Sequence, residues 1–373
     1  MFIGVPREIK NHEYRVGLTP GGVKELVLDG HQVLVECGAG AGIGLADADY
    51  ANAGAELVAD PRDIYARCEL IIKVKEPQPH ECAQLKAGQV IFTYLHLAPD
   101  LAQTQGLLAS GCTAIAYETV TDHKGGLPLL APMSEVAGRM AIQAGAHCLE
   151  KAQGGRGVLL GGVPGVSPAR VLVLGGGVVG VNAARMAIGL GADVTLVDTS
   201  LTRLKELDAL YGPELKTLYS TVDNIERELA RSELVIGAVL IAGAAAPKLI
   251  TKQQLALMPT GAVLVDVAID QGGCFETSRL TTHEDPTYEV DGIVHYCVAN
   301  MPGAVAYTST FALINATLPY VKALANLGWQ QALQQNAHLA QGLNIHQGQV
   351  ICPVVAEAHG LAHTPLQQVL TIS

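Results

Sequence analysis

The stretch RVLVLGGGVVGVNAARMAIGLGADVTLVD, Arg170–Asp198, decides the fold that we predict for this chain. It begins with a short apolar run, Val171–Leu174, whose length and β-branched content are typical of a buried parallel strand. An Ala-rich segment, Val181–Leu190, then predicts a helix, and Gly191 is expected to end it. A second apolar strand, Val194–Val197, follows. The order strand, helix, strand predicts a βαβ unit.

Three glycines between the first strand and the helix form the pattern G-x-G-x-x-G, which is typical of dinucleotide-binding folds. Gly175 would allow a tight turn after the strand. Gly177 has no Cβ atom, so a pyrophosphate could approach the backbone there, and Gly180 would allow close packing of helix and strand. The helix N-terminus would then offer free N–H groups and positive dipole to the phosphates. The alternative is a glycine-rich turn that binds no nucleotide.

Asp198 lies at the end of the second strand of this unit. A carboxylate at that position can bind both ribose hydroxyls and repel a 2′-phosphate. We therefore expect the cofactor to be NAD and not NADP.

The composition favours an α/β protein with more than one domain. The chain has 373 residues, which is enough for two or three domains of about 100–200 residues each. Apolar residues make up 49% of it and aromatic residues only 4%, so an aliphatic core suited to parallel sheets is expected. The net charge is −11 and no Lys/Arg cluster occurs, so neither nucleic acid nor an anionic membrane is an expected partner.

The eight cysteines form no C-x-x-C pair. We expect them to be reduced core residues and neither a disulfide framework nor a zinc site. No signal peptide is expected before the strand-like start of the chain. The most apolar run, Leu234–Pro247, is too short and too often interrupted by glycine for a membrane span, which needs about 20 residues. A cytoplasmic location is therefore expected.

Residues 1 to about 125 alternate β-like runs with helical stretches, so a second β/α repeat with a second parallel sheet is expected. The expected strands are Phe2–Val5, Val33–Glu36, Leu70–Val74, Val90–Tyr94 and Thr113–Tyr117. The expected helices, each opening at or next to a proline, are Pro20–Asp29, Pro61–Arg67 and Pro99–Ser110. The glycine-rich stretch 38–44 resembles a phosphate-binding loop, but neither frame closes G-x-G-x-x-G, so an ordinary loop is expected.

Another helix is expected over Pro132–Gln153, with Ser134 as its N-cap, followed by a Gly/Pro-rich loop at 154–168. The elements expected after Asp198 are a helix at Leu201–Leu210, strands at Leu234–Ile241, Ala262–Ala268 and Ile293–Val298, and a helix from Thr308 to about Asn326. If the C-terminal tail packs on the first domain, that domain is discontinuous in sequence.

Polar residues lie in loops or at strand ends, where open α/β sheets bind ligands. They are Arg15, Lys75, His96, Asp270 and Asn300. Arginine can bind a carboxylate through two hydrogen bonds, and lysine can hold an anionic oxygen or polarise a carbonyl. Histidine or aspartate can move a proton while a hydride moves. Such a set beside a nicotinamide predicts dehydrogenase chemistry.

Each of these residues also has a structural alternative. Arg15 could be a solvated loop charge, Lys75 could form a surface ion pair with Glu76, and His96 could be an N-cap or a core residue. Asp266 competes with Asp270 but lies within a strand, so we expect it to make a structural hydrogen bond.

A metal site is a weaker hypothesis. Glu118, Asp122 and His123 could suggest one, but nothing else in the sequence completes a ligand set. We therefore expect no metal.

Motifs spread over nearly the whole chain resemble those of bacterial alanine dehydrogenases, and they occur in the order of that family. They are GVPREIKNHEYRVGLTP (4–20), KVKEP (73–77), YLHLA (94–98), PMSEVAGRMA (132–141), GGVPGV (161–166), LGGGVVG (174–180), VDVAIDQGGCFET (265–277), TTHEDPTY (281–288) and HYCVANMPGAV (295–305).

The resemblance implies an α/β fold of two Rossmann-like domains with parallel sheets. An NAD-binding domain, 129–305, would be inserted into a discontinuous substrate domain, 1–128 and 306–373. It further implies reversible oxidative deamination of L-alanine by NAD, giving pyruvate, ammonium and NADH, and a homo-hexamer.

The resemblance also implies roles for single residues. Arg15 would pair with the substrate carboxylate, Lys75 would lie near the carboxylate or carbonyl oxygen, and Asn300 would help to bind the substrate. His96 and Asp270 would be the acid/base pair. The residues that resemble the family's NAD contacts are Ser134, Gly175, Gly177, Val178, Val179, Gly180, Asp198, Arg203, Ser220, Val239, Leu240, Val267, Ala268, Ile269, Arg279, Val298, Ala299 and Met301.

Three other functions remain open on the sequence. The soluble NAD-binding portion of proton-translocating transhydrogenase shares the R-V-x-x-T-P start and a lysine like Lys75, but it usually lacks a histidine like His96. A catalytically inactive NAD-binding protein could use the same fold, since a fold does not determine a function. A dehydrogenase for a neighbouring amino acid is the third.

Overall fold

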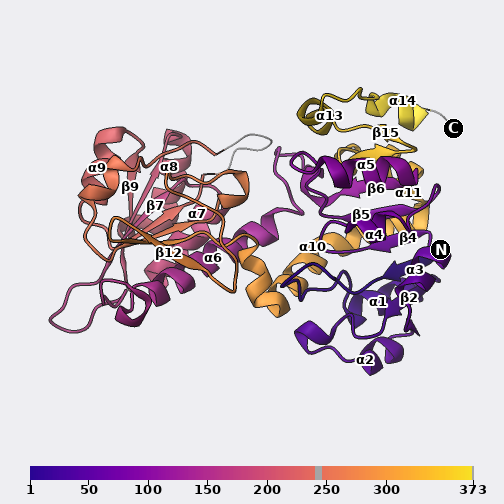
Figure 1. Cartoon of the computed structure of the whole chain (residues 1–373), viewed down its shortest axis with the longest axis horizontal. Coiled ribbons are helices and arrows are strands. Elements are labelled where there is room, and N and C mark those ends of the chain that lie inside the picture. Colours follow the sequence, from indigo (N-terminus) through magenta and orange to yellow (C-terminus); the bar gives the residue numbers. More distant parts are fainter. Residues whose placement is uncertain (240–245, 372–373) are drawn as a thin grey trace. The chain divides into compact units, whose positions relative to one another are not determined.

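The computed structural model describes residues 1–239 and 246–371 and divides them into two compact units. One unit consists of Met1–Met133 and the chain from Val305 onward, and the other is Ser134–Ala304. In Figure 1 the first unit carries both the indigo and the yellow ribbon, whereas the second carries magenta to orange. The second unit is therefore inserted into the first. The sequence-based limits are 128/129 and 305/306, and those of the structure are 133/134 and 304/305.

The first unit contains an eight-stranded sheet in the order β15-β14-β6-β5-β4-β1-β2-β3. Six strands are parallel: β1 Phe2–Val5, β2 Gln32–Glu36, β3 Glu56–Val58, β4 Leu70–Ile72, β5 Val90–Thr93 and β6 Thr113–Ala116. Their spatial order, 3-2-1-4-5-6 in chain sequence, is that of a doubly wound sheet. The predicted parallel sheet is confirmed over these six strands, and β14 (Leu343–His346) and β15 (Gln349–Val350) extend it at one edge with antiparallel pairing.

The helices of the first unit begin where the sequence provides prolines and capping side chains. Thr19, Asp60 and Asp100 each accept a backbone N–H of the following turn, which supplies a partner for a donor that the helix cannot satisfy itself. The helices before the insertion are α1 Pro20–Leu28, α2 Asp47–Asn52, α3 Pro61–Arg67, α4 Pro79–Cys82 and α5 Leu101–Ser110. Those after it are α10 Ala306–Leu327, α11 Trp329–Gln335, α12 Ala337–Ala340, α13 Pro353–His359 and α14 Leu366–Thr371.

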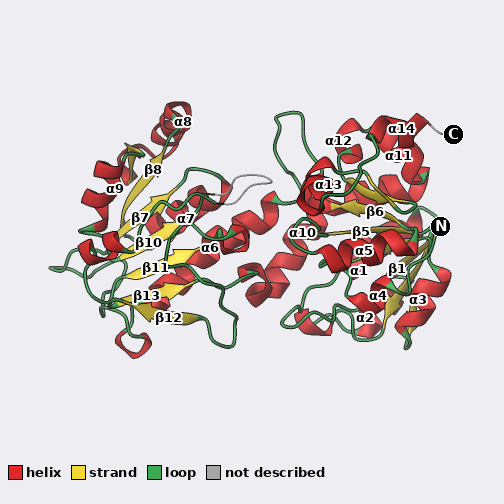
Figure 2. Cartoon of the chain, turned by 45° about the horizontal axis from the view of Figure 1, so that its top comes forward, coloured by secondary structure: helices red, strands yellow, loops and turns green. Residues whose placement is uncertain are grey.

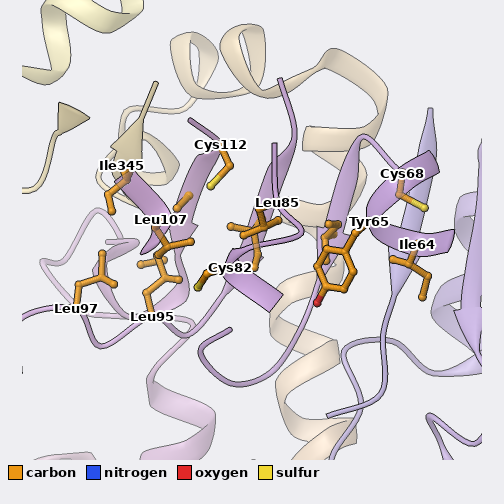
Figure 3. Packing of buried hydrophobic residues seen from close by; sticks show 14 of the residues in the cluster. Ile64, Tyr65, Cys68, Cys82, Leu85, Leu95, Leu97, Leu107, Cys112 and Ile345 are labelled. Atoms are coloured by element: carbon orange, nitrogen blue, oxygen red, sulfur yellow. The ribbon is translucent and has the colours of Figure 1, made fainter. Parts of the chain in front are cut away.

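The core of this unit explains why its two sequence segments stay together. Ile345 of β14 belongs to the same buried cluster as Leu95, Leu97 and Leu107 (Figure 3). Burying these aliphatic side chains stabilises the folded chain, so the tail completes the core of the N-terminal segment. This confirms the discontinuous arrangement.

The cysteines are free, as predicted, but not all of them are core residues. Burial raises the pKa of the Cys68 and Cys82 thiols to about 12 and that of Cys112 to about 11. Cys37 is exposed and Cys352 is half-buried, so the prediction of core positions is wrong for these two.

The second unit contains a seven-stranded sheet in the order β12-β13-β11-β10-β7-β8-β9 (Figure 2). Its strands are β7 Arg170–Leu174, β8 Asp193–Asp198, β9 Leu215–Tyr219, β10 Leu234–Gly237, β11 Val263–Asp266, β12 Thr287–Val290 and β13 Ile293–Tyr296. Its helices include α6 Ala131–Cys148, α7 Val178–Gly189, α8 Leu201–Tyr211 and α9 Val222–Leu229. All strands except β12 are parallel, and their order is again 3-2-1-4-5-6.

Several predicted boundaries in this unit need correction. Ser134 is not an N-cap, because α6 already begins at Ala131. The helix after the glycine motif begins at Val178 and not at Val181, since the first turn uses residues of the motif itself. The strand predicted to reach Ile241 ends at Gly237, and residues 240 and 241 lie outside the described part. Among the described residues, none of the helices has the length and apolar character that crossing a membrane would require.

Candidate active site

The first unit places three predicted site residues after neighbouring parallel strands. Arg15 lies in the loop after β1, Lys75 follows β4, and His96 follows β5. The chain leaves β1 and β4 in opposite directions, so this is the switch point of the sheet, where open α/β sheets bind ligands. The backbone N–H of Lys75 donates to Glu8 of the loop after β1 at 3.4 Å, so the loops after β1 and β4 come close together.

Arg15 is a buried side chain and not a solvated loop charge. It is 2% exposed, and its Nε and Nη2 donate to the two carboxylate oxygens of Glu13, both at 2.6 Å. Burial alone would raise the pKa of Glu13, but the hydrogen bonds and charge of Arg15 bring it below the ordinary value. Nη1 of Arg15 approaches the sulfur of Met133 at 3.0 Å. The pair with Glu13 therefore sets the direction of the guanidinium plane.

A cavity of about 390 Å³ adjoins this pair. Its lining includes Arg7, Glu8, Glu13, Arg15 and the glycine-rich stretch 38–42. That stretch is the loop expected from the sequence, and two of its glycines, Gly40 and Gly42, serve packing. A Cβ atom on Gly42 would lie 2.6 Å from the carbonyl oxygen of Tyr14, so only glycine lets the loop pack beside the Arg15 segment.

His96 is exposed and adopts a left-handed backbone conformation with φ +48°. Glu118 accepts hydrogen bonds from the backbone N–H groups of Leu95 and His96, the latter at 2.7 Å. The imidazole stacks parallel to the ring of the buried Tyr94, with 5.7 Å between centroids. His96 is therefore not a core residue, and the N-cap of α5 is Asp100. Both structural alternatives for His96 are excluded.

Glu76 forms its ion pair with Lys10, whereas the structural alternative considered above was a surface ion pair between Lys75 and Glu76. The carboxylate of Glu76 pairs with Lys10, although the charge of Lys75 also lowers the pKa of Glu76. The backbone N–H of Lys75 donates to Glu8 at 3.4 Å.

Of the residues considered above for a metal site, Glu118 accepts hydrogen bonds from backbone N–H groups. The described residues contain no group of three His, Cys, Asp or Glu side chains that could hold a metal.

The three motif glycines of the second unit occupy the positions that the dinucleotide fingerprint requires. Gly175 has φ +101°, a conformation that favours glycine. A Cβ atom on Gly180 would lie 1.8 Å from the carbonyl oxygen of Gly175, whereas one on Gly177 would meet no atom within 4 Å. No side chain caps the first turn of α7. Open space and uncapped N–H groups therefore meet where a pyrophosphate would bind.

Asp198 is held in position by backbone donors. Its Oδ2 accepts the N–H of Gly176 and its Oδ1 accepts the N–H of Ser200, both at 2.7 Å. The Nε of Arg203 donates to the carbonyl oxygen of Gly176 at 2.7 Å. Each carboxylate oxygen retains lone-pair capacity, so both can accept hydrogen bonds from a ribose.

Asp266 makes the structural hydrogen bonds that were expected of it. It is fully buried at the end of β11 and accepts the N–H groups of Ala268 at 3.1 Å and Cys274 at 2.7 Å, and the hydroxyl of Ser278 at 2.5 Å. Burial raises the pKa of Asp266, and these hydrogen bonds limit the rise. They shape the loop that carries the exposed Asp270 on a short 3₁₀ helix, Ile269–Gln271.

The predicted cofactor residues follow the carboxyl ends of strands in the second sheet. They lie after β7 (Gly175, Gly177, Val178, Val179, Gly180), at β8 and in α8 (Asp198, Arg203), after β9 (Ser220), after β10 (Val239), after β11 (Val267, Ala268, Ile269) and after β13 (Val298, Ala299, Met301). Asn300 belongs to the last group and has φ +58°. Ser134 lies in the first turns of α6, and Leu240 lies outside the described residues.

Arg279 lies in the loop after β11 and is supported by an aromatic side chain. Its guanidinium carbon stands 4.1 Å from the centroid of the Tyr288 ring, and the backbone N–H of Arg279 donates to the Tyr288 hydroxyl at 2.8 Å. The Tyr288 ring also stacks with the ring of His295, with 4.9 Å between centroids, and burial lowers the pKa of His295. These contacts hold the backbone and the guanidinium group of Arg279 beside Tyr288.

Sequence reasoning missed the residues that support the site. Glu8, Glu13 and Lys73 are buried charges, and Glu118 was considered only as a weak metal ligand. The spacing Glu-x-Arg at 13–15 was visible, but a loop with alternating charges is usually solvated. Only burial distinguishes the two cases, and burial is a property of the folded chain.

Comparison with known proteins identifies the family. The family model described as "Alanine dehydrogenase/PNT, N-terminal domain" matches residues 4–137, and the model described as "Alanine dehydrogenase/PNT, C-terminal domain" matches residues 141–353. The alanine dehydrogenase of Halomonas elongata is 64% identical over 363 residues, which cover 97% of this chain and 98% of that protein.

The chain belongs to the alanine dehydrogenase family.

Other members and structures agree with this assignment. The alanine dehydrogenase of Bacillus subtilis is 54% identical over 371 residues, which cover 99% of this chain and 98% of that protein. A solved L-alanine dehydrogenase superposes with a TM-score of 0.94 at 52% identity, covering 96% of this chain and 99% of the other. A transhydrogenase from Sinorhizobium meliloti, with a TM-score of 0.81, 24% identity and coverage of 95% and 99%, shares the fold. The inserted unit is thus the family's Rossmann-like, dinucleotide-binding domain.

Proposed function

We propose that this chain catalyses the reversible, NAD-dependent oxidative deamination of L-alanine to pyruvate and ammonium. The observation that carries the proposal is the combination of family membership over nearly the full length with Arg15, Lys75 and His96 after neighbouring parallel strands of the first sheet. A glycine-rich turn with the geometry of a dinucleotide site supports the cofactor half of the reaction.

In this proposal the substrate carboxylate binds Arg15. The guanidinium is oriented by Glu13 and buried, so it forms stronger hydrogen bonds with an anion than a solvated side chain would. Lys75 lies near the carboxylate or the carbonyl oxygen, and Asn300 is the other proposed substrate-binding residue. The cavity beside Arg15 is lined by charged side chains on one side and by Gly and Ala residues on the other, which suits a small polar ligand.

His96 and Asp270 form the proposed acid/base pair. The bound nicotinamide supplies the chemistry of hydride transfer. Removal of a hydride from Cα of the amino acid and of a proton from its nitrogen leaves an iminium. Water must then attack this iminium and ammonia must leave, so several protons move. His96 is exposed at a strand end with a backbone fixed by Glu118, and Asp270 is exposed on its own strand-end turn, so each can exchange protons.

We further propose NAD as the cofactor in preference to NADP. Asp198 would accept the ribose hydroxyls with both oxygens, and its charge would repel a 2′-phosphate. The α7 N-terminus would bind the pyrophosphate beside Gly177. Arg203, Ser220, Arg279, Ser134, Leu240 and the strand-end residues named above complete the proposed cofactor site.

The experiment that tests the function follows the absorbance of NADH with pyruvate and ammonium, in the wild type, His96→Ala and Asp270→Ala. The wild type should consume NADH, and each variant should lose at least about 100-fold in kcat, since general acid/base catalysis contributes about 10²–10⁴-fold. NADPH should be a poor substitute. NADH that binds without being consumed would favour an inactive NAD-binding protein, and full activity of His96→Ala would reject its catalytic role.

A homo-hexamer in the cytoplasm is the proposed working state. The resemblance to the family supports the hexamer, and eight free cysteines suit a reducing compartment. Light scattering of the purified protein tests the assembly, because a mass of one or two chains would contradict it. The small-molecule partners are L-alanine, pyruvate and ammonium, and neither nucleic acid nor membrane is proposed as a partner.

A further inference from the structure

Three buried charged side chains, Glu8, Lys73 and Glu81, form a cluster near the carboxyl ends of β1 and β4 in the first sheet. Lys73 is 0% exposed, and its Nζ lies 3.1 Å from Glu8 and 2.9 Å from Glu81. Tyr65 on α3 donates its hydroxyl to the same Glu81 oxygen at 2.9 Å. The cluster links the loop after β1 with the segment just after β4, with α3 and with α4, and no step of the proposed reaction uses it.

Such a cluster costs free energy that apolar side chains would not. Burial removes three charges from water, and replacing buried ion pairs with apolar side chains is often neutral or stabilising. The pKa of Glu8 shows this cost: burial raises it even though Lys73 favours the charged form. A function in positioning is one reason for a chain to retain such a cluster.

The hydrogen bonds of the two Glu8 carboxylate oxygens show which part of the chain the cluster holds in place. Its Oε2 is held by Lys73, and its Oε1 accepts the backbone N–H groups of Val74 at 2.7 Å and Lys75 at 3.4 Å. These two N–H groups come just after β4 ends at Ile72. Glu8 therefore accepts the backbone N–H groups of Val74 and Lys75 in place of a neighbouring strand, where the chain leaves the sheet after β4.

We propose that Glu8 and Lys73 are positioning residues that hold the backbone of Lys75 where its ammonium group meets the substrate. Glu8 lines the cavity beside Arg15, but both of its oxygens are engaged by Lys73 and the two N–H groups, so it acts through Lys75. The inference rests on the proposed role of Lys75 in substrate binding.

Two double variants isolate the hydrogen bond from the charges. Glu8→Gln/Lys73→Met keeps an acceptor oxygen for the two N–H groups without a buried charge pair. Glu8→Met/Lys73→Met has nearly the same shape and no acceptor. In both, Glu81 retains the Tyr65 hydroxyl and the backbone N–H of Gln78 at 2.7 Å as donors. The two variants therefore differ in the group that faces Val74 and Lys75.

The readout is the KM for pyruvate, compared with the KM for NADH and with kcat. The Met/Met variant should raise the KM for pyruvate by about 10- to 100-fold over the Gln/Met variant, the range that a misplacement near 1 Å can produce. The KM for NADH should agree within about twofold, because the cofactor residues lie on other loops. NADH binding and thermal unfolding confirm that both variants are folded. Equal pyruvate KM values in two folded variants would overturn the inference.

A third variant separates this inference from the proposed function. Lys75→Ala should raise the KM for pyruvate at least as much as the Met/Met variant. If it does and the two double variants agree with each other, only the positioning role fails. If Lys75→Ala leaves the KM for pyruvate unchanged, the substrate-binding role of Lys75 fails and the inference fails with it. A wild type that does not consume NADH would reject the proposed function itself.

Discussion

At the residue scale, His96 shows how the protein holds a reactive side chain. Its backbone has φ +48°, which L-residues other than Asn, Asp and His rarely adopt and which costs about 1–3 kcal/mol at a non-glycine position. Asn300, another proposed site residue, has φ +58°. Backbone conformations of this kind persist only where the surroundings enforce them. For His96 the enforcing group is the Glu118 carboxylate.

Glu118→Ala should therefore lower kcat about 10- to 100-fold with little change in the KM for NADH, because the His96 backbone is freed to leave its conformation. Glu118→Gln should lose much less, since its amide oxygen can still accept both N–H groups. Steady-state kinetics with pyruvate, ammonium and NADH measure this.

Asp122→Ala is the matched control for this experiment. The Asp122 carboxylate accepts N–H groups of Lys124 and Gly126 within its own turn. Wild-type kcat in Glu118→Ala would show that His96 keeps its position without Glu118.

At the element scale, the crossing from β7 into α7 depends on two glycines for different reasons. Gly180 faces the backbone of Gly175 at a distance that leaves no room for a Cβ atom, so it serves packing. Gly177 faces open space and has the extended backbone of an N-cap, which alanine can adopt. One glycine is needed by the fold and the other by a ligand.

Gly180→Ala should destabilise the chain by about 1–3 kcal/mol or more, because the backbone oxygen in its way must move. Gly177→Ala should unfold like the wild type but bind NADH at least about tenfold more weakly, since its methyl group occupies the path of the pyrophosphate. Thermal unfolding and NADH titration separate the two effects. A Gly177→Ala protein with unchanged NADH affinity would contradict the proposed cofactor position.

At the scale of the whole molecule, one strand order appears twice. Both units contain six parallel strands in the order 3-2-1-4-5-6, and both carry their proposed ligand residues at the carboxyl ends of those strands. The second unit is continuous in sequence, whereas the first needs the tail after Val305 to complete its sheet and core. The two units should therefore differ in their ability to fold alone.

The segment 134–304 expressed by itself should fold and bind NADH within about tenfold of the affinity of the full chain, because its sheet and its core are both complete. It should not consume NADH, since Arg15, Lys75 and His96 are missing. Circular dichroism and NADH fluorescence are the measurements. An unfolded segment would show that the inserted unit depends on the rest of the chain.

The central strands and the glycine motif could be predicted because their signals are local. Buried parallel strands are continuous apolar runs, and G-x-G-x-x-G meets steric conditions within a few residues. The strands β3, β9, β12, β14 and β15 were missed. Four of them, β3, β9, β12 and β15, are edge strands, and sequences such as LKTLY and TYEV mix polar and apolar residues because edge strands are partly exposed. The antiparallel edges were missed for the same reason. The fifth, β14, lies between β15 and β6 and is mostly buried.

The sequence by itself determined the α/β class, the βαβ unit, the inserted arrangement and the identity of the polar residues at strand ends. The inserted arrangement follows from the resemblance to alanine dehydrogenases, and the other three follow from periodicity, glycine geometry and the positions of strand ends along the chain. Only the tertiary structure decided that Arg15 pairs with Glu13, that Glu118 holds His96, and that Glu8 and Lys73 stand behind Lys75. Burial and the meeting of distant segments determine whether a charge is solvated, paired or positioned, and neither is encoded in the spacing of residues along a chain.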